Sequence, residues 1–243
     1  MIDYKKYENI VHKFISKYKN KKWFVGACIS GSFVTKKMTE KSDIDVFIFT
    51  KGINWRKKGS KIINGIQIEY FINPIELMKN NIKKEFGVHR LETSIFKNAK
   101  VIYDSHGEVK NLIKLAQKQA KIKSKPMSKQ ESKYFRYIIF EAVKDVEESL
   151  ERNDLIAFHR LIYKTIEDCI LAVYQYYGKW LPAYKHIDED LKKIDPKFAN
   201  LILNYFNQRT NSSRLKAYKR IIKYVVNLYG GPIKEYELKC FIH

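Results

Sequence analysis

The sequence of 243 residues has no apolar run that approaches the ~18 residues needed to span a bilayer. Its first seven residues lack the apolar core of a signal peptide, so we expect a cytoplasmic protein with no membrane partner. Only three cysteines occur, Cys28, Cys169 and Cys240, and no Cys-x-x-Cys pair is present, which fits a reducing compartment and argues against a zinc site. The six histidines show no zinc-binding spacing either.

Acidic residues are also scarce: 47 Lys and Arg stand against 26 Asp and Glu, giving a formal net charge of +21. Such a surplus invites a nucleic-acid interpretation, because basic side chains neutralise phosphates. The lysines are scattered along the whole chain, however, and short basic runs such as residues 19–22 and 56–58 fall in predicted loops. A solvated basic surface is therefore favoured over a polynucleotide groove, which stays open as an alternative.

The hydrophobic pattern of the first half of the chain predicts alternating helices and strands. Hydrophobic periodicity predicts helices over residues 4–18, 86–98 and 108–121, a further helix after Pro74, and strands over residues 23–30, 43–49, 61–63, 66–72 and 99–103. Between two of these strands, Asn64-Gly65 is a hairpin turn signal. This half is therefore expected to form a mixed sheet with flanking helices.

From Ser128 onward the pattern is helical, beginning with a capping box of Ser128 and Glu131. Helices are predicted over residues 129–152, 155–177, 187–194, 213–229 and from residue 196, with no strand signal before the extreme C-terminus. Aromatic residues recur at helical spacing and indicate a core: Tyr134, Phe135, Tyr137 and Phe140. We predict an α+β protein with an α/β domain over residues 1–123 and a helical-bundle domain over 128–243.

The chemistry-bearing residues lie where one predicted strand ends and the next begins. Gly31 and Ser32 follow the first strand, and Asp43 and Asp45 open the second. Because side chains alternate along a strand, the two aspartates project from the same face. Paired carboxylates suit Mg²⁺, which binds through carboxylates and substrate phosphates, while Gly31 and Ser32 can approach a phosphate closely.

A third acid is expected on a neighbouring strand, and Glu69 qualifies. Alternate isoleucine and tyrosine residues of the segment 66–72 occupy one face, which leaves Glu69 on the other. Three acids on adjacent strands can hold two Mg²⁺ ions that bridge a nucleophile and a phosphate group. An Asp-x-Asp pair alone could be turn chemistry at a sheet edge, but Gly31-Ser32 and Glu69 together favour the metal site.

These residues resemble the nucleotidyltransferases of the DNA polymerase β superfamily. Gly31, Ser32, Asp43 and Asp45 match the motif of that family, and Glu69 matches by its strand position. The short loop and the helical second half are similar to antibiotic and minimal nucleotidyltransferases. The resemblance implies transfer of a nucleoside monophosphate from a nucleoside triphosphate, ATP above all, to a hydroxyl group, with release of pyrophosphate and with two Mg²⁺ ions. Asp43 and Asp45 would ligate both ions, and Glu69 would ligate the one at the nucleophile and help take its proton.

The acceptor is less defined than the reaction. The resemblance favours a small molecule, including aminoglycoside-like or lincosamide-like antibiotics, whose modification confers resistance. A protein or RNA acceptor, or a nucleotide-binding module without turnover, is the alternative. The resemblance also implies that Lys185, in a segment similar to one between bundle helices of some members, reaches the nucleotide phosphates, and a homodimer is compatible with it. Glu141 and Asp145, on an acidic helix stripe with Glu148, are candidates for a general base, with a solvated face balanced by lysine and arginine as the favoured interpretation.

Overall fold

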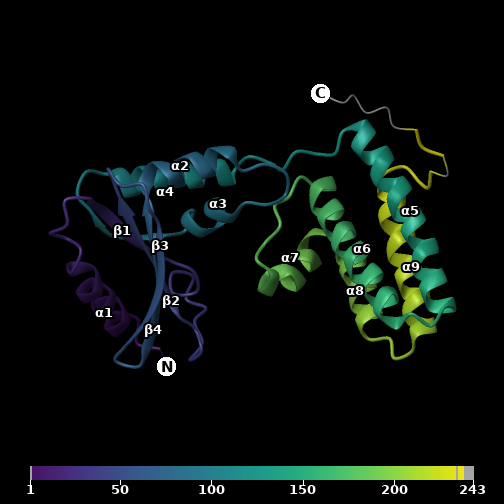
Figure 1. The fold of residues 1–243 in the computed structure, drawn as a ribbon, viewed down its shortest axis with the longest axis horizontal. Coiled ribbons are helices and arrows are strands. Elements are labelled where there is room, and N and C mark those ends of the chain that lie inside the picture. The colour runs from purple at the N-terminus through teal and green to yellow at the C-terminus, as the bar shows by residue number, and fades with distance from the viewer. Residues whose placement is uncertain (1, 234, 238–243) are drawn as a thin grey trace. The chain divides into compact units, whose positions relative to one another are not determined.

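The computed structural model describes residues 2–233 and 235–237, which separate into two compact units (Figure 1). The first unit runs to Glu85 and resumes over Arg90–Ile122. The second takes the short segment Phe86–His89 and the chain from Lys123 onward. The described residues do not include Cys240, His243 or the rest of the extreme C-terminus, which is the part of the second half where a strand was not excluded. The expected domain limits at residues 123 and 128 stay a prediction.

The first unit is a mixed sheet with helices on both faces, which confirms the expected fold class for this part of the chain. Its elements are α1 (Tyr4–Ser16), β1 (Phe24–Ser30), β2 (Ile44–Thr50), β3 (Lys57–Ile63), β4 (Ile66–Pro74), α2 (Ile75–Lys84), α3 (Leu91–Phe96), β5 (Lys100–Asp104) and α4 (Glu108–Ala120). The strand order is β3-β4-β2-β1-β5, and within it only β2 and β4 are paired in parallel.

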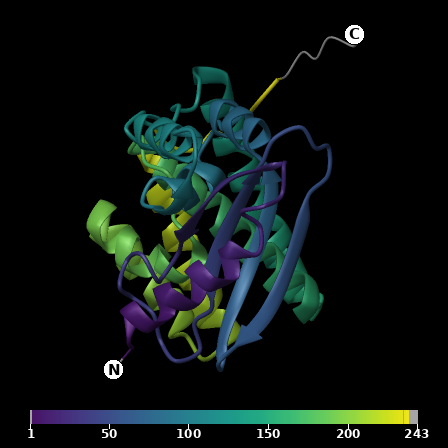
Figure 2. The same ribbon diagram turned by 90° about the vertical axis from the view of Figure 1, so that its left-hand side faces the viewer.

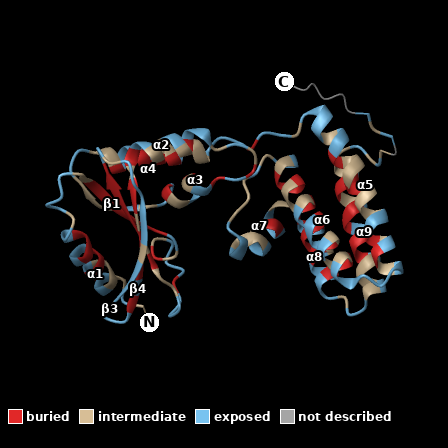
Figure 3. Ribbon diagram, viewed as in Figure 1, coloured by how far each residue is buried: buried red, intermediate tan, exposed pale blue. Residues whose placement is uncertain are grey.

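Helices cover both faces of this sheet (Figures 1 and 2), and an apolar layer is buried against each face. Helix α1 buries Ile10, Val11, Phe14 and Ile15 against isoleucine and valine side chains of β1, β2 and β4. The opposite face packs against α2, α3 and α4. The central strands β1 and β2 are buried along almost their whole length (Figure 3), as is expected of strands covered on both faces.

The hairpin between β3 and β4 forms as predicted, but its first strand is longer than expected. Asn64 and Gly65 have φ angles of +52° and +78°, the left-handed values that a two-residue hairpin turn requires. Strand β3 begins at Lys57, so Lys57 and Lys58 are strand residues and their assignment to a loop was wrong. Their polar, exposed pattern is that of an edge strand. Such a strand lacks the buried apolar residues from which a strand is predicted in a sequence.

The helix expected over residues 86–98 is much shorter, since α3 covers only Leu91–Phe96. Gly87 adopts a φ of +69°, which ends any helical path there. Val88 packs into the core of the second unit, and its carbonyl accepts a hydrogen bond of 2.9 Å from the Leu181 amide. Tertiary contacts thus take Phe86–His89 out of the first unit altogether.

The second unit is helical throughout its described residues, as predicted. Its elements are α5 (Lys129–Glu151), α6 (Leu155–Tyr176), the 3-10 turn η1 (Tyr184–His186), α7 (Ile187–Ile194), α8 (Pro196–Phe206) and α9 (Asn211–Leu228). The capping box of Ser128 and Glu131 starts α5. Helix α9 begins two residues before the predicted start at Ser213, because Thr210 and Ser213 form a second capping box. No helix of the described chain has the length and apolar content needed to cross a bilayer.

The core of this unit forms mainly from the apolar stripe of α6, including Phe158, Ile162 and Ile166, packed against α5, α8 and α9. Among the aromatic residues of α5 predicted as core, Phe135 is buried. Tyr134 is not: its side chain is 47% exposed and its ring lies beside Tyr236, so that assignment was wrong. Helical spacing alone does not say where a buried stripe ends.

A buried carboxylate ties three helices of the second unit together. Asp195 caps α8 through the Phe198 amide, at 2.9 Å, and accepts hydrogen bonds from the hydroxyls of Tyr177 (3.1 Å) and Tyr224 (2.8 Å). Desolvation and the neighbouring Asp195 carboxylate raise the pKa of both tyrosines. Burial also raises the pKa of Tyr205 to about 12.

These shifts predict a loss of stability at alkaline pH. A pKa raised in the folded state favours folding while the hydroxyl stays protonated, so the contribution is full below about pH 10 and fades as the pH rises toward about 12. We expect the free energy of unfolding, measured by urea titration, to fall steeply over that range. Tyr205→Phe tests this assignment, because it removes the titrating hydroxyl, and in the described part of the chain no group hydrogen-bonds to that hydroxyl. This variant should make the decline shallower, and an unchanged slope would contradict the assignment.

Candidate active site

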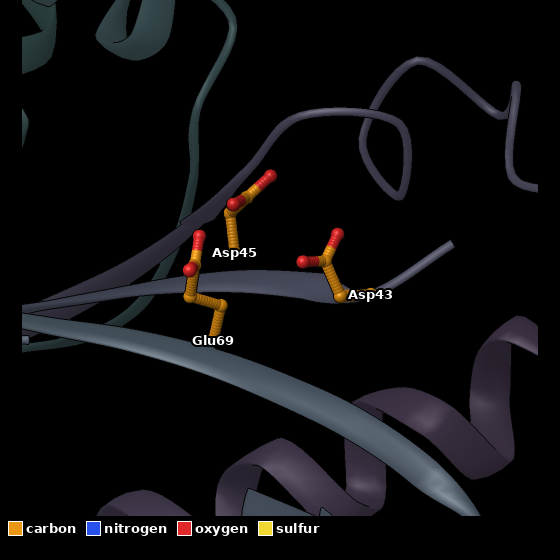
Figure 4. A group of neighbouring side chains, drawn as sticks. All are labelled: Asp43, Asp45 and Glu69. Atoms are coloured by element: carbon orange, nitrogen blue, oxygen red, sulfur yellow. The ribbon is translucent and has the colours of Figure 1, made fainter. Parts of the chain in front are cut away.

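Asp43, Asp45 and Glu69 lie together at one end of the sheet (Figure 4). Asp43 directly precedes β2, Asp45 is its second residue, and Glu69 is the register partner of Asp45 on the parallel strand β4. One carboxylate oxygen from each residue lies within 4.8 Å of the other two. All three side chains are half-buried, so they are held by the sheet and still reach solvent.

The two buried layers determine this convergence. On β2 and β4, the side chains of Ile44, Val46, Ile68 and Tyr70 pack toward α1, so the residues between them must face the other way. Asp45 and Glu69 therefore project from the same face. A slip of either strand by one residue would move its acid into the apolar layer against α1, and the cost of burying unpaired charge excludes it.

On the face that carries the acids, a polar row of side chains across the strands is followed by a mostly apolar row. The register pairs place a polar row across four strands, consisting of Ser30, Asp45, Glu69 and Ser60. The neighbouring row is mostly apolar and consists of Cys28, Phe47, Phe71 and Lys58. Phe47 and Phe71 stack with ring centroids 4.8 Å apart, under an edge contact from Phe96 of α3. The acids thus sit at the margin of the apolar layer.

Cys28 in the apolar row is not a reactive group. Its thiol is completely buried, and burial raises its pKa well above the usual range. A thiolate is the nucleophilic form of cysteine, so Cys28 contributes packing and no covalent chemistry.

Gly31 and Ser32 form the turn that follows β1, beside Asp45. Gly31 has a φ of +73°, and a Cβ atom at this position would collide with the Asp45 carboxylate. The turn is closed by the Lys37 amide, which donates to the Ser32 carbonyl at 3.0 Å. Only glycine satisfies both the left-handed backbone and the close approach to the carboxylate. Ser32 is half-buried in this turn.

A basic residue that the sequence did not single out also reaches the cluster. Lys58 of β3 places its Nζ 2.7 Å from Glu69 Oε1 and 5.1 Å from the centroid of the Phe71 ring. Its position follows from the register that pairs Lys58 with Phe71 and Ser60 with Glu69. The available signal was the predicted hairpin: extending the first strand backward from Asn64-Gly65 places Lys58 on the same face as Glu69.

The remaining candidates lie in the second unit. Lys185 is exposed on the turn η1, next to Tyr184, whose hydroxyl donates to Glu167 at 3.2 Å. Its contact with nucleotide phosphates stays a prediction. On α5, Glu141 pairs with Lys144 at 2.8 Å, Asp145 is exposed, and Glu148 pairs with Arg152 at 2.7 Å. These pairs are those of a solvated helix face, and neither Glu141 nor Asp145 is assigned as a base.

The donor set of the cluster fits a hard cation. Among residues 2–233 and 235–237, these three acids form the one group of three or more His, Cys, Asp or Glu side chains whose ligand atoms converge. All its donors are carboxylate oxygens, the ligands that Mg²⁺ prefers, whereas zinc and copper favour nitrogen or sulfur. Without a cation, three carboxylates at this spacing repel one another.

A mixed sheet that presents three carboxylates beside a Gly-Ser turn is the arrangement of an enzyme that transfers nucleotidyl groups. The comparison with family models agrees: the model described as "Nucleotidyltransferase domain" matches residues 11–149, more than half of the 243 residues. The chain therefore belongs to this family, within the superfamily of DNA polymerase β-like nucleotidyltransferases. The match includes the acids and the start of the helical unit.

A solved structure from Exiguobacterium sibiricum, described as a nucleotidyltransferase-like protein, shares the fold. The similarity covers 91% of this chain and 74% of that one, with a TM-score of 0.52 and 10% sequence identity. At this identity the likeness concerns the fold alone. No curated protein sequence gives a match to the chain.

The contact between Gly31 and Asp45 yields a prediction with a built-in control. Gly31→Ala adds backbone strain and displaces the Asp45 carboxylate, whereas Gly52→Ala, at a φ of +71° with open space around it, adds strain only. We expect both variants to lose about 1–2 kcal/mol in urea unfolding. Only Gly31→Ala should weaken Mn²⁺ binding, by at least about tenfold, as measured by electron paramagnetic resonance. Equal Mn²⁺ affinities in the two variants would contradict the role of Gly31.

Proposed function

We propose that this enzyme transfers a nucleoside monophosphate, preferentially from ATP, to a hydroxyl group of a small-molecule acceptor in a Mg²⁺-dependent reaction. The observation that carries the proposal is the convergence of Asp43, Asp45 and Glu69 within 4.8 Å on neighbouring strands. Membership of the nucleotidyltransferase family supports it.

In the proposed reaction, the acceptor oxygen forms a bond to the α-phosphorus of the triphosphate. The bond from that phosphorus to the oxygen bridging the α- and β-phosphates breaks, and pyrophosphate leaves with the electron pair. The hydroxyl proton passes to a carboxylate, for which Glu69 is assigned, and then to solvent. Little covalent chemistry falls to the protein, so positioning and charge stabilisation provide the rate acceleration.

The residues take the following roles in this proposal. Asp43 and Asp45 hold two Mg²⁺ ions, and Glu69 holds the one on the acceptor side. When bound, such ions neutralise charge on the phosphates and lower the pKa of the attacking hydroxyl. Ser32 hydrogen-bonds a phosphate oxygen, while Gly31 leaves room for it. Lys185 is the residue proposed to contact the phosphates.

The acceptor is proposed to be small, with hydroxyl-bearing antibiotics as one class. A polycationic acceptor is disfavoured by the net charge of +21. The same charge favours an RNA or protein acceptor as a second candidate, and Lys58 on the edge strand β3 places a basic group beside Glu69. Salt dependence separates the two candidates, because RNA binding weakens steeply as the salt concentration rises.

Substitution of the aspartates tests the reaction. We expect Asp43→Asn and Asp45→Asn each to reduce nucleotidyl transfer at least about 100-fold, because each removes an anionic ligand from the proposed ion site. The assay follows transfer from each radiolabelled triphosphate, with Mg²⁺, to a panel of hydroxyl compounds and RNA. Glu40→Gln is the control, since it makes the same charge change at an exposed loop position. Transfer that survives in both aspartate variants would refute the proposed mechanism.

A further inference from the structure

The acidic site contains its own cation. Lys58 places its ammonium 2.7 Å from Glu69 Oε1, and Glu69 is one of the three acids whose oxygens converge within 4.8 Å. The ammonium therefore lies directly beside the cluster. It neutralises part of the repulsion that three neighbouring carboxylates would otherwise experience.

The strand register fixes where the Lys58 side chain begins, but the ammonium at its end is exposed to solvent. The register pairs Lys58 with Phe71, two residues along from the pair of Ser60 and Glu69, so the Lys58 side chain starts on the acid face of an edge strand. Its Nζ lies 5.1 Å from the centroid of the Phe71 ring. The Lys58 side chain is nevertheless 64% exposed, against 25% for Glu69. Its ammonium can move into water at little cost, whereas Glu69 stays where it is.

We propose that Lys58 is the counter-ion of Glu69 in the ion-free site and is exchanged for the divalent cation when that cation binds. A carboxylate oxygen that accepts the Lys58 ammonium has fewer lone pairs available for a metal ion, so the two cations compete for Glu69. Lys58 is in this respect a positioning residue: it keeps Glu69 directed toward the aspartates and leaves when the ion arrives. The inference rests on the proposed function only in taking the three acids as an ion site.

Metal affinity without turnover tests the exchange. We expect Lys58→Met, which keeps much of the aliphatic stem over Phe71 but removes the charge, to bind Mn²⁺ about three- to tenfold more tightly than the wild type. Lys58→Arg, which keeps a cation, should stay within about twofold. Electron paramagnetic resonance of free Mn²⁺, without nucleotide, gives the affinities.

Lys57 provides the matched control on the same strand. It is also an exposed lysine, but it is paired with Ile72 and starts on the opposite face from Lys58. Lys57→Met removes the same charge, and at 0.15 M salt screening should keep its effect below about twofold. If Lys58→Met and Lys57→Met shift the affinity equally, the exchange is wrong and only the general charge matters. If the wild type does not bind Mn²⁺, or if Asp45→Asn does not abolish the binding, the ion site of the proposed function is wrong as well.

Release of the ammonium is measured directly by lysine acetylation. In the full chain, an amine-reactive acetylating reagent is applied with and without saturating Mg²⁺, and the modification of Lys58 and Lys57 is quantified by mass spectrometry. Exchange predicts that Mg²⁺ raises the acetylation rate of Lys58 about threefold or more, with Lys57 as the internal reference. An unchanged ratio of Lys58 to Lys57 acetylation, under conditions where Mn²⁺ binds, would overturn the proposal and leave the nucleotidyl transfer reaction standing.

Discussion

The parallel pairing of β2 with β4 is the constraint on which the site depends. It sets Asp45 beside Glu69, and two apolar layers hold it in place, one on each face of the sheet. Charge could not bring these acids together, because like charges repel. The isoleucine-rich face against α1 supplies the free energy, and the carboxylates occupy the positions left on the opposite face. The site is therefore a by-product of burial: the residues that assemble it are apolar and take no part in its chemistry.

Many features of the fold and of the site could be predicted from the sequence because they depend on local interactions. The alternation of Asp43 and Asp45, the turn at Asn64-Gly65 and the capping box of Ser128 and Glu131 depend on neighbours a few residues away, and the structure has them as predicted. What the sequence could not show depends on distant contacts. Helix α3 is short because Val88 packs into another unit, and Lys58 reaches Glu69 only through the β3–β4 register.

The distribution of acids explains how a basic protein keeps an anionic centre. On the helices, acids stand one turn from a lysine or arginine and pair locally, as Glu141 does with Lys144 and Glu148 with Arg152. A strand offers no neighbour at that spacing, so an acid on β2 or β4 faces only what the adjacent strands bring. Secondary structure thus decides whether an acid is paired within its own helix or by a residue of a neighbouring strand. Lys58 reaches the site from such an adjacent strand and pairs with Glu69 at 2.7 Å.

The two units are not consecutive pieces of the chain. Phe86–His89 lies inside the first unit by sequence and belongs to the second by contact, where the Val88 carbonyl accepts a hydrogen bond from Leu181. A genetic exchange with a single junction near residue 123 would therefore join a new bundle to an old Phe86–His89 segment. Both parts of the second unit must change together for the bundle core to close around Val88. A bundle exchanged alone would have to accept the original Phe86–His89 segment in its core.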